Sequence, residues 1–155
     1  MRTPLLVGLC LGFASLAAAQ DKVDTKWHCA PVTTQQKFDV GDMPGHAMGV
    51  AQGTCTATSS AMGEKSGAWT ETQNLWPKKA ATHGTFVVTT DGGDKIYYAY
   101  TGDQNLTAMT GVNKFKVAGG TGKYKSAKGE GSCPGTFTKD GSSDWTCTGT
   151  FSQGQ

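Results

Sequence analysis

The sequence predicts an all-β protein, an antiparallel barrel of about eight strands that is stapled by disulfides. Three observations predict it: short runs in which apolar and polar side chains alternate, turn residues between those runs, and an even number of cysteines after residue 20. Only two leucines, Leu75 and Leu106, follow that point, and few helix-forming residues recur at helical spacing. Closure into a barrel would also remove the sheet edges that promote aggregation.

The N-terminus has the order of a secretory signal peptide. Met1-Arg2 is a basic start, Leu5 to Leu16 is an apolar run, and Ala17-Ala18-Ala19 supplies the small residues of a cleavage site. The apolar run is shorter than the roughly 20 residues of a membrane-spanning helix, and an uncleaved anchor is the alternative. We expect residues 1–19 to be removed, residues 20–155 to form one β-barrel domain, and the protein to reach the periplasm or the extracellular space.

Charge and motifs exclude several kinds of partner. The 14 Lys and Arg residues nearly balance the 12 Asp and Glu residues, whereas nucleic acid or an anionic membrane surface needs clustered positive charge. No stretch after residue 20 is apolar enough to span a membrane. The run Gly119 to Lys123 lacks the first glycine of a P-loop and is followed by Tyr124 instead of Ser or Thr. We expect no nucleic acid, no membrane span and no cofactor, and the sequence does not specify the oligomeric state.

The chain after the predicted signal peptide contains four cysteines, Cys29, Cys55, Cys133 and Cys147. An even number in an exported chain indicates two disulfides, and the lack of Cys-x-x-Cys spacing disfavours zinc. Four cysteines permit three pairings, which sequence alone does not distinguish. We favour Cys133–Cys147, because the turn Asp140-Gly141 lies midway and would bring both sulfurs to similar height on paired strands, together with Cys29–Cys55.

The clearest strand is Asp144 to Ser152, because Trp145, Cys147 and Phe151 share one of its faces and threonines occupy the other. Thr85 to Thr90 and Lys95 to Thr101 flank a strong hairpin turn, Asp91-Gly92-Gly93-Asp94. Tyrosines lie on both faces of the second of these strands, so the sequence does not identify its inward face. Further strands are predicted at Lys26 to Ala30, Gln35 to Val40, Gly49 to Thr58, Gly67 to Leu75, Asn113 to Val117 and Ala127 to Cys133.

Several glycine-rich segments resemble a known family. They are Gly119-Gly120-Thr121-Gly122-Lys123-Tyr124, Ala127-Lys128-Gly129-Glu130-Gly131, His83-Gly84-Thr85-Phe86 and Asp94-Lys95-Ile96-Tyr97-Tyr98. They look like the late strands of allene-oxide-cyclase-like and dirigent-like β-barrels, over roughly Gly84 to Phe151. The resemblance implies an eight-stranded antiparallel barrel with a central cavity, in a secreted bacterial relative of unassigned activity. No catalytic residue of the plant cyclases matches a position here, so the resemblance implies no cyclase activity.

Aromatic side chains are candidates for a ligand pocket, which is typically apolar with few polar groups. The five candidates are Trp69, Phe86, Tyr98, Tyr100 and Phe115. We expect a cavity that binds a small apolar ligand without catalysis, although core packing alone also explains such residues. An isomerase or cyclase is the alternative, with Glu71 as the candidate acid or base if burial raises its pKa. A solvated, outward Glu71 is the simpler interpretation.

One loop suggests a metal as a further alternative. Met43, His46 and Met48 place two thioethers and an imidazole within six residues, and this ligand set suits the soft copper(I) ion. The same segment could equally cover one end of a barrel. The main prediction contains no metal site.

Overall fold

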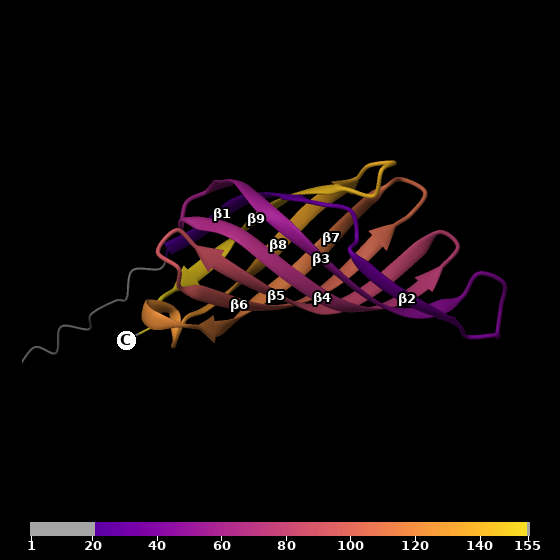
Figure 1. Cartoon of the computed structure of the whole chain (residues 1–155), viewed down its shortest axis with the longest axis horizontal. Coiled ribbons are helices and arrows are strands. Elements are labelled where there is room, and N and C mark those ends of the chain that lie inside the picture. Colours follow the sequence, from indigo (N-terminus) through magenta and orange to yellow (C-terminus); the bar gives the residue numbers. More distant parts are fainter. Residues whose placement is uncertain (1–20, 155) are drawn as a thin grey trace, which may run out of the picture.

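The computed structural model describes residues 21–154 of the 155-residue chain, so the predicted signal peptide, residues 1–19, lies outside the described residues. This part of the chain contains nine strands and one 3-10 helix (Figure 1). In chain order they are β1 (Asp21–Cys29), β2 (Thr34–Asp39), β3 (Ala47–Ser60), β4 (Glu64–Trp76), β5 (Lys79–Thr90), β6 (Lys95–Asn105), β7 (Thr110–Gly120), η1 (Gly122–Tyr124), β8 (Lys128–Phe137) and β9 (Ser143–Ser152).

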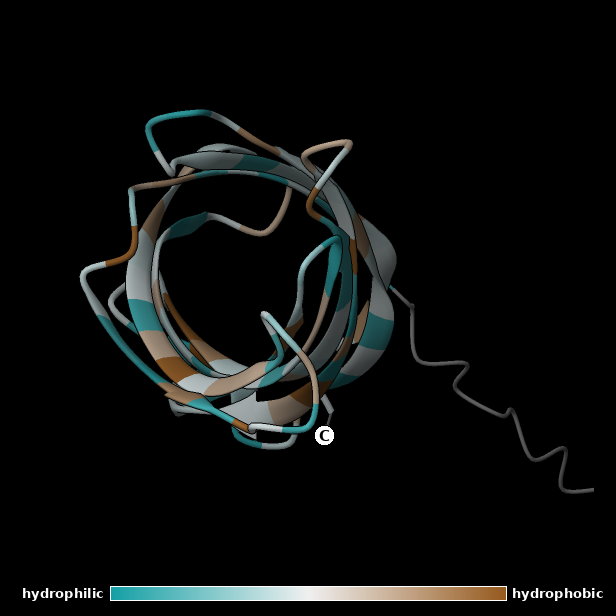
Figure 2. Ribbon diagram, turned by 90° about the vertical axis from the view of Figure 1, so that its right-hand side faces the viewer, coloured by the Kyte–Doolittle hydropathy of each residue, from teal (hydrophilic) through white to brown (hydrophobic). Residues whose placement is uncertain are grey.

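Eight of these strands form a closed antiparallel barrel. The sheet runs in the order β1, β9, β8, β7, β6, β5, β4, β3, and pairing of β1 with β3 closes the ring. Viewed along the barrel axis, the ribbon is a continuous ring (Figure 2). The ninth strand, β2, pairs with β3 outside this ring. The predicted all-β, eight-stranded barrel is therefore confirmed, with one additional strand.

The ninth strand, β2, pairs with the part of the β3 edge that β1 does not occupy. β1 pairs with the half of β3 from Cys55 to Ser60, and β2 pairs with the half from Ala47 to Gln52. The two strands run in the same direction and are separated by a segment that contains Pro31, which has no N–H group to donate. β1 also pairs along its length with β9, whereas β2 continues along β3 alone.

Most strands follow the predicted alternation and are longer than predicted, whereas β2 has the predicted length and is exposed at all six positions. In β9, Trp145, Cys147 and Phe151 are buried, and the threonines between them are exposed. β1 begins at Asp21 rather than Lys26, and the predicted bounds of β5, β7 and β8 were also too short. The added segments carry few large apolar side chains, so their pattern alone did not indicate strands. Ala127, predicted to begin a strand, precedes β8 and is fully buried.

We call the end of the barrel that carries η1, at the left in Figure 1, the closed end. A packed core fills this end. Tyr124 is 2% exposed, and its ring meets Phe151 edge to face with centroids 5.9 Å apart. Val88 and Ile96 are completely buried beside them. Gly122 has a φ of +52°, which favours glycine, and a Cβ there would lie 2.1 Å from the Asp94 carboxylate. The predicted glycine-rich turn therefore helps to close this end.

Both predicted disulfides are confirmed. Cys29 and Cys55 face each other across the β1–β3 pair that closes the ring, and Cys133 and Cys147 join β8 to β9. Disulfides form and persist in oxidising compartments, which fits an exported protein. Among residues 21–154, no helix has the length and apolar character to cross a membrane.

Candidate functional site

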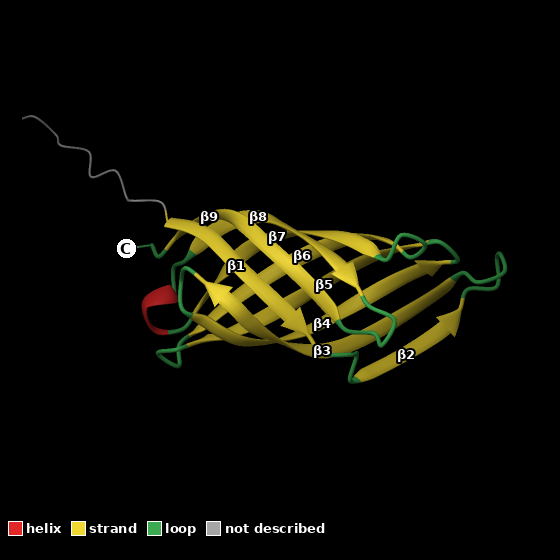
Figure 3. Cartoon of the chain, turned by 90° about the horizontal axis from the view of Figure 1, so that it is seen from above, coloured by secondary structure: helices red, strands yellow, loops and turns green. Residues whose placement is uncertain are grey.

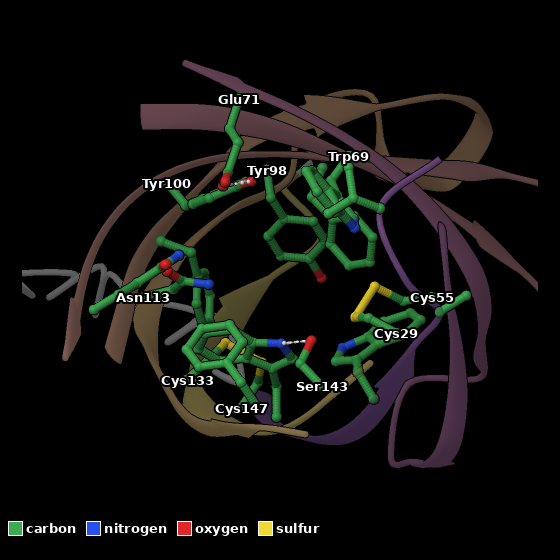
Figure 4. Close-up of a pocket in the computed structure, with 18 of the residues that line it drawn as sticks. Cys29, Cys55, Trp69, Glu71, Tyr98, Tyr100, Asn113, Cys133, Ser143 and Cys147 are labelled. Carbon is green, nitrogen blue, oxygen red and sulfur yellow. Dashed lines mark hydrogen bonds between the residues drawn. A yellow bond between two sulfur atoms is a disulfide. The ribbon is translucent and has the colours of Figure 1, made fainter. Parts of the chain in front are cut away.

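A cavity of about 270 Å³ lies inside the barrel. It extends away from η1 to the opposite end, which we call the mouth, where Val32, Gln104 and Phe137 line it. Figure 4 shows Glu71 and Tyr100 on one side and the Cys29–Cys55 disulfide across from them. Pockets for drug-sized ligands have volumes of about 300–1,000 Å³. This cavity therefore suits a smaller molecule, of one or two rings.

Four aromatic rings from different strands meet across the barrel interior and line the cavity. Trp27 of β1 meets Phe86 of β5 edge to face, with centroids 4.9 Å apart. Phe86 lies 6.3 Å from Tyr98, and Tyr98 meets Phe115 edge to face at 5.5 Å. Edge-to-face pairs of this kind are favourable beyond the apolar area they bury. The rings form a rigid apolar surface between the packed closed end and the mouth.

A buried carboxyl group on the cavity wall belongs to Glu71, which is only 8% exposed. Tyr100 on β6 donates its hydroxyl to Oε2 of Glu71 at 2.8 Å, and Gln73 donates Nε2 to Oε1 at 2.8 Å. Gln35 on β2 in turn donates Nε2 to Oε1 of Gln73 at 2.8 Å. A chain of hydrogen bonds therefore fixes the carboxyl group and links it to the additional strand.

Burial changes the acidity of this group. It raises the pKa of the Glu71 carboxyl above the ordinary value of 4.5, and interactions with Gln73, Tyr100 and Thr82 offset part of that rise. Burial, followed by the adjacent Glu71 charge, also raises the pKa of the Tyr100 hydroxyl, so this group stays protonated. A carboxyl that holds its proton in an apolar site can donate a hydrogen bond, or the proton itself.

Two further buried polar atoms stand near Glu71, Oγ1 of Thr82 and Oδ1 of Asn113. Neither makes a well-formed hydrogen bond within the described chain, although Thr82 lies close enough to the Glu71 carboxyl to lower its pKa. Thr82, Gly102 and Asn113 stand side by side on β5, β6 and β7. A Cβ at Gly102 would lie 2.2 Å from the Asn113 oxygen and 2.5 Å from the Thr82 oxygen. Unpaired buried polar groups are rare and costly, and Asn113 lines the cavity, so a ligand group that donates a hydrogen bond to its oxygen would be favoured.

A second buried glutamate, Glu64, also lines the cavity and is 5% exposed. Tyr98 donates its hydroxyl to Oε1 at 2.7 Å, and Ser60 donates to Oε2 at 3.1 Å. Thr25 donates a further hydrogen bond to Oε2. Three hydroxyl donors therefore occupy this carboxyl group.

All five predicted pocket residues lie on the cavity wall: Trp69, Phe86, Tyr98, Tyr100 and Phe115. Their contact with a ligand stays a prediction. The simpler interpretation of Glu71 was wrong, because its side chain points inward. Sequence reasoning missed Gln73 and Asn113, which also line the cavity. Alternate residues of a strand share a face. Gln73 therefore shares a face with Glu71, and Asn113 shares a face with Phe115, which is the pattern that would have identified both.

The candidate copper ligands of the alternative interpretation, Met43, His46 and Met48, lie elsewhere, at and near the β2–β3 turn. The His46 ring stacks on Trp76 with centroids 5.2 Å apart. Nδ1 of His46 lies 2.6 Å from an Asp42 oxygen, and Nε2 lies 2.8 Å from Oδ1 of Asn74. Hydrogen bonds to Asn74 and then Asp42 raise the His46 pKa.

Both His46 nitrogens are therefore engaged by oxygen atoms, while the Met43 and Met48 side chains are exposed. Within residues 21–154, no three His, Cys, Asp or Glu side chains gather as metal ligands would. Copper(I) binding by Met43, His46 and Met48 stays an alternative, and the expectation of no metal site stays a prediction.

Comparison with known proteins bears on the fold. No protein-family model matches the chain, and no curated protein matches it. Among solved structures it is similar to a pterocarpan synthase dirigent protein, with a TM-score of 0.55 and 12% identity over 97% of each chain. It is also matched to a pyocyanin demethylase, with a TM-score of 0.43 and 18% identity over 83% of this chain and 99% of that one. The first likeness identifies the fold, and the fold alone, as a dirigent-like β-barrel.

Proposed function

We propose that this protein is exported, that it binds a small, mostly apolar molecule in its barrel cavity, and that it orients this molecule through one polar group of the molecule. The observation that carries the proposal is an aromatic-lined cavity of about 270 Å³ with the Glu71 carboxyl on its wall. Most of the lining is apolar, which favours burial of a ring system. Several of the polar groups, Glu71, Gln73, Gln104 and Asn113, lie toward the mouth and would select the orientation of the ligand.

The comparison and the N-terminal pattern support this proposal. The dirigent protein of the same fold is described as a pterocarpan synthase, so a barrel of this kind acts on a small molecule in at least that protein. The two disulfides and the basic, apolar, small-residue order of residues 1–19 support export.

Fluorescence titration with two matched probes tests the proposal. Trp27, Trp69 and Trp145 line the cavity and would report its occupation. We expect 1-naphthol and 1-methylnaphthalene both to bind. The naphthol should bind roughly 2- to 12-fold more tightly, because one net hydrogen bond contributes about 0.5–1.5 kcal/mol.

Two adjacent positions on β7 supply the matched variants. Asn113→Phe places a ring in the cavity, whereas Val112→Phe places the same ring at an exposed position. We expect Asn113→Phe to abolish binding of both probes and Val112→Phe to bind as the wild type does. Absence of binding to the wild type, or unchanged binding by Asn113→Phe, would exclude the cavity as the site.

Acid catalysis in the same cavity is a second candidate, favoured by the burial that raises the Glu71 pKa. An isomerase or cyclase needs a group that holds a proton near neutral pH and gives it to a bound substrate. A ¹³C NMR titration of the Glu71 carboxyl tests this requirement. We expect a pKa above the ordinary glutamate value, and a pKa at or below that value would remove the acid role.

A further inference from the structure

β2 has a free edge. It lies outside the eight-strand ring, and within residues 21–154 it pairs with β3 only. In Figure 3 it stands apart at the lower right, with no strand drawn beyond it. All six of its residues are exposed. An unprotected edge presents backbone N–H and C=O groups that can pair with another strand.

The register with β3 determines which backbone groups face this edge. The N–H of Val40 donates to the carbonyl of His46 at 3.0 Å. Antiparallel pairs alternate between hydrogen-bonded and non-hydrogen-bonded positions, so Phe38 with Met48, two residues on, is also a hydrogen-bonded pair. The same alternation continues along β2. The remaining residues, Gln35, Lys37 and Asp39, therefore turn their backbone N–H and C=O groups away from β3, toward the free edge.

These outward groups allow a second copy of the chain to pair with β2 around a two-fold axis. An axis that passes beside Phe38 places Lys37 opposite Asp39 of the second copy, and Asp39 opposite its Lys37. Each such pair can exchange two backbone hydrogen bonds. Opposite charges facing each other across strands are favourable. An axis beside Lys37 would instead oppose two like charges, which is unfavourable.

The same axis brings the two Phe38 side chains together. Phe38 is 63% exposed, the most exposed of the large apolar side chains in the described chain. In this register the two Phe38 residues form a non-hydrogen-bonded pair, in which side chains approach more closely. Met48 lies beside Phe38 on β3 and is 45% exposed, so it extends the apolar contact.

We propose that the protein forms a two-fold dimer through antiparallel pairing of β2 with β2 of a second copy, centred on Phe38. The self-complementary order Lys37, Phe38, Asp39 identifies the partner as the chain itself rather than another protein. The dimer extends each β3–β2 edge into one continuous sheet between two barrels. This association does not depend on the proposed ligand.

Charge reversal tests the dimer with variants that leave the barrel core unchanged. Lys37→Asp places an aspartate at position 37 opposite Asp39 of the second copy, on both sides of the axis. Asp39→Lys likewise places a lysine at position 39 opposite Lys37 of the second copy. We expect each single reversal to raise the dimer dissociation constant by about tenfold or more, measured by sedimentation equilibrium at low salt, because two charge pairs change sign. The double variant, Lys37→Asp with Asp39→Lys, should restore the wild-type constant.

A mixture of the two single variants is the sharpest measurement. One chain then carries two acidic groups at positions 37 and 39 and the other carries two basic groups, so the heterodimer should form although neither variant dimerises alone. Val112→Ser, an exposed apolar change on β7, is the control and should leave the constant unchanged. A wild-type protein that is monomeric at millimolar concentration would overturn the proposal. So would single reversals without effect, or a mixture or double variant that stays monomeric.

Discussion

At the closed end of the barrel Glu64 accepts hydrogen bonds from Tyr98, Ser60 and Thr25, whereas nearer the mouth Glu71 accepts them from Tyr100 and Gln73. Both glutamates belong to β4, both point inward, and each is bonded to a tyrosine of β6. Both carboxyl groups line the cavity, but Glu64 lies nearer the packed end that carries η1, whereas Glu71 lies nearer the mouth, beside Gln73 and the unpaired Oδ1 of Asn113.

This difference indicates that the Glu64 carboxyl stabilises the fold, whereas the Glu71 carboxyl is available to a ligand. Three hydroxyl groups converge on Glu64 and leave little capacity for another partner. Glu71 is held by two side chains, its pKa is raised by burial, and it lies where a ligand could reach it. We therefore expect changes at the closed end to affect mainly stability, and changes near the mouth to affect mainly binding.

The largest expected effect contrasts two buried phenylalanines. Phe151 is 1% exposed in the closed-end core, and Phe115 is 6% exposed on the cavity wall. Phe151→Ala should lower the free energy of unfolding by about 3–5 kcal/mol, because it opens a new cavity in a packed region. Phe115→Ala should cost less, since one side of this ring already borders open space and contacts fewer atoms.

Urea denaturation followed by circular dichroism measures both variants, with the disulfides left intact. Probe binding should be preserved in Phe151→Ala at temperatures where it is folded, and weakened in Phe115→Ala. Equal losses of stability at the two positions would contradict the contrast between the two ends.

An intermediate effect is expected from removing each tyrosine hydroxyl. Tyr98→Phe leaves an Oε1 oxygen of Glu64 buried without its donor, which should cost about 1–3 kcal/mol of unfolding free energy. Tyr100→Phe should cost less, because the freed Oε2 of Glu71 lies nearer the mouth of the cavity, where water can replace the donor. Midpoints of urea unfolding distinguish the two variants. A larger loss for Tyr100→Phe would indicate that the Glu71 network, not the Glu64 network, is the structural one.

The same contrast explains what sequence reasoning could predict. The strand Ser143–Ser152 was evident because its inward residues, Trp145, Cys147 and Phe151, are large or form a disulfide. The first half of β5 was not, because its inward residues are Ala80, Thr82 and Gly84. Small inward residues weaken the alternation that indicates a strand. Near the mouth these small residues also leave space inside the barrel. They therefore both weaken the sequence pattern of the strand and contribute to the cavity.

The inward position of Glu71 could not be predicted for a different reason. A charged residue in a strand is usually solvated, and its burial here depends on partners distant in sequence, chiefly Tyr100. The disulfide pairing was easier to predict, because Cys133 and Cys147 flank a turn signalled by Asp140-Gly141. Local turn chemistry is visible in a sequence, whereas a buried polar network is created by the assembled barrel.

The smallest expected effect is a pH dependence that comes from Glu71. Because its pKa is raised in the folded state, folding favours the protonated carboxyl. Its stabilising contribution is complete below the ordinary value of 4.5 and is lost as the pH rises through the folded-state pKa. Glu71→Gln has no titrating carboxyl at this position, so its melting temperature should increase relative to that of the wild type as the pH rises from 4 to 8.

Glu130→Gln, an exposed change on β8, should show no such gain and serves as the control. Differential scanning calorimetry across this pH range measures all three proteins. A constant difference between Glu71→Gln and the wild type would mean that the Glu71 proton is held equally in the folded and unfolded chains. The proposed acid role of Glu71 would then lose its physical basis.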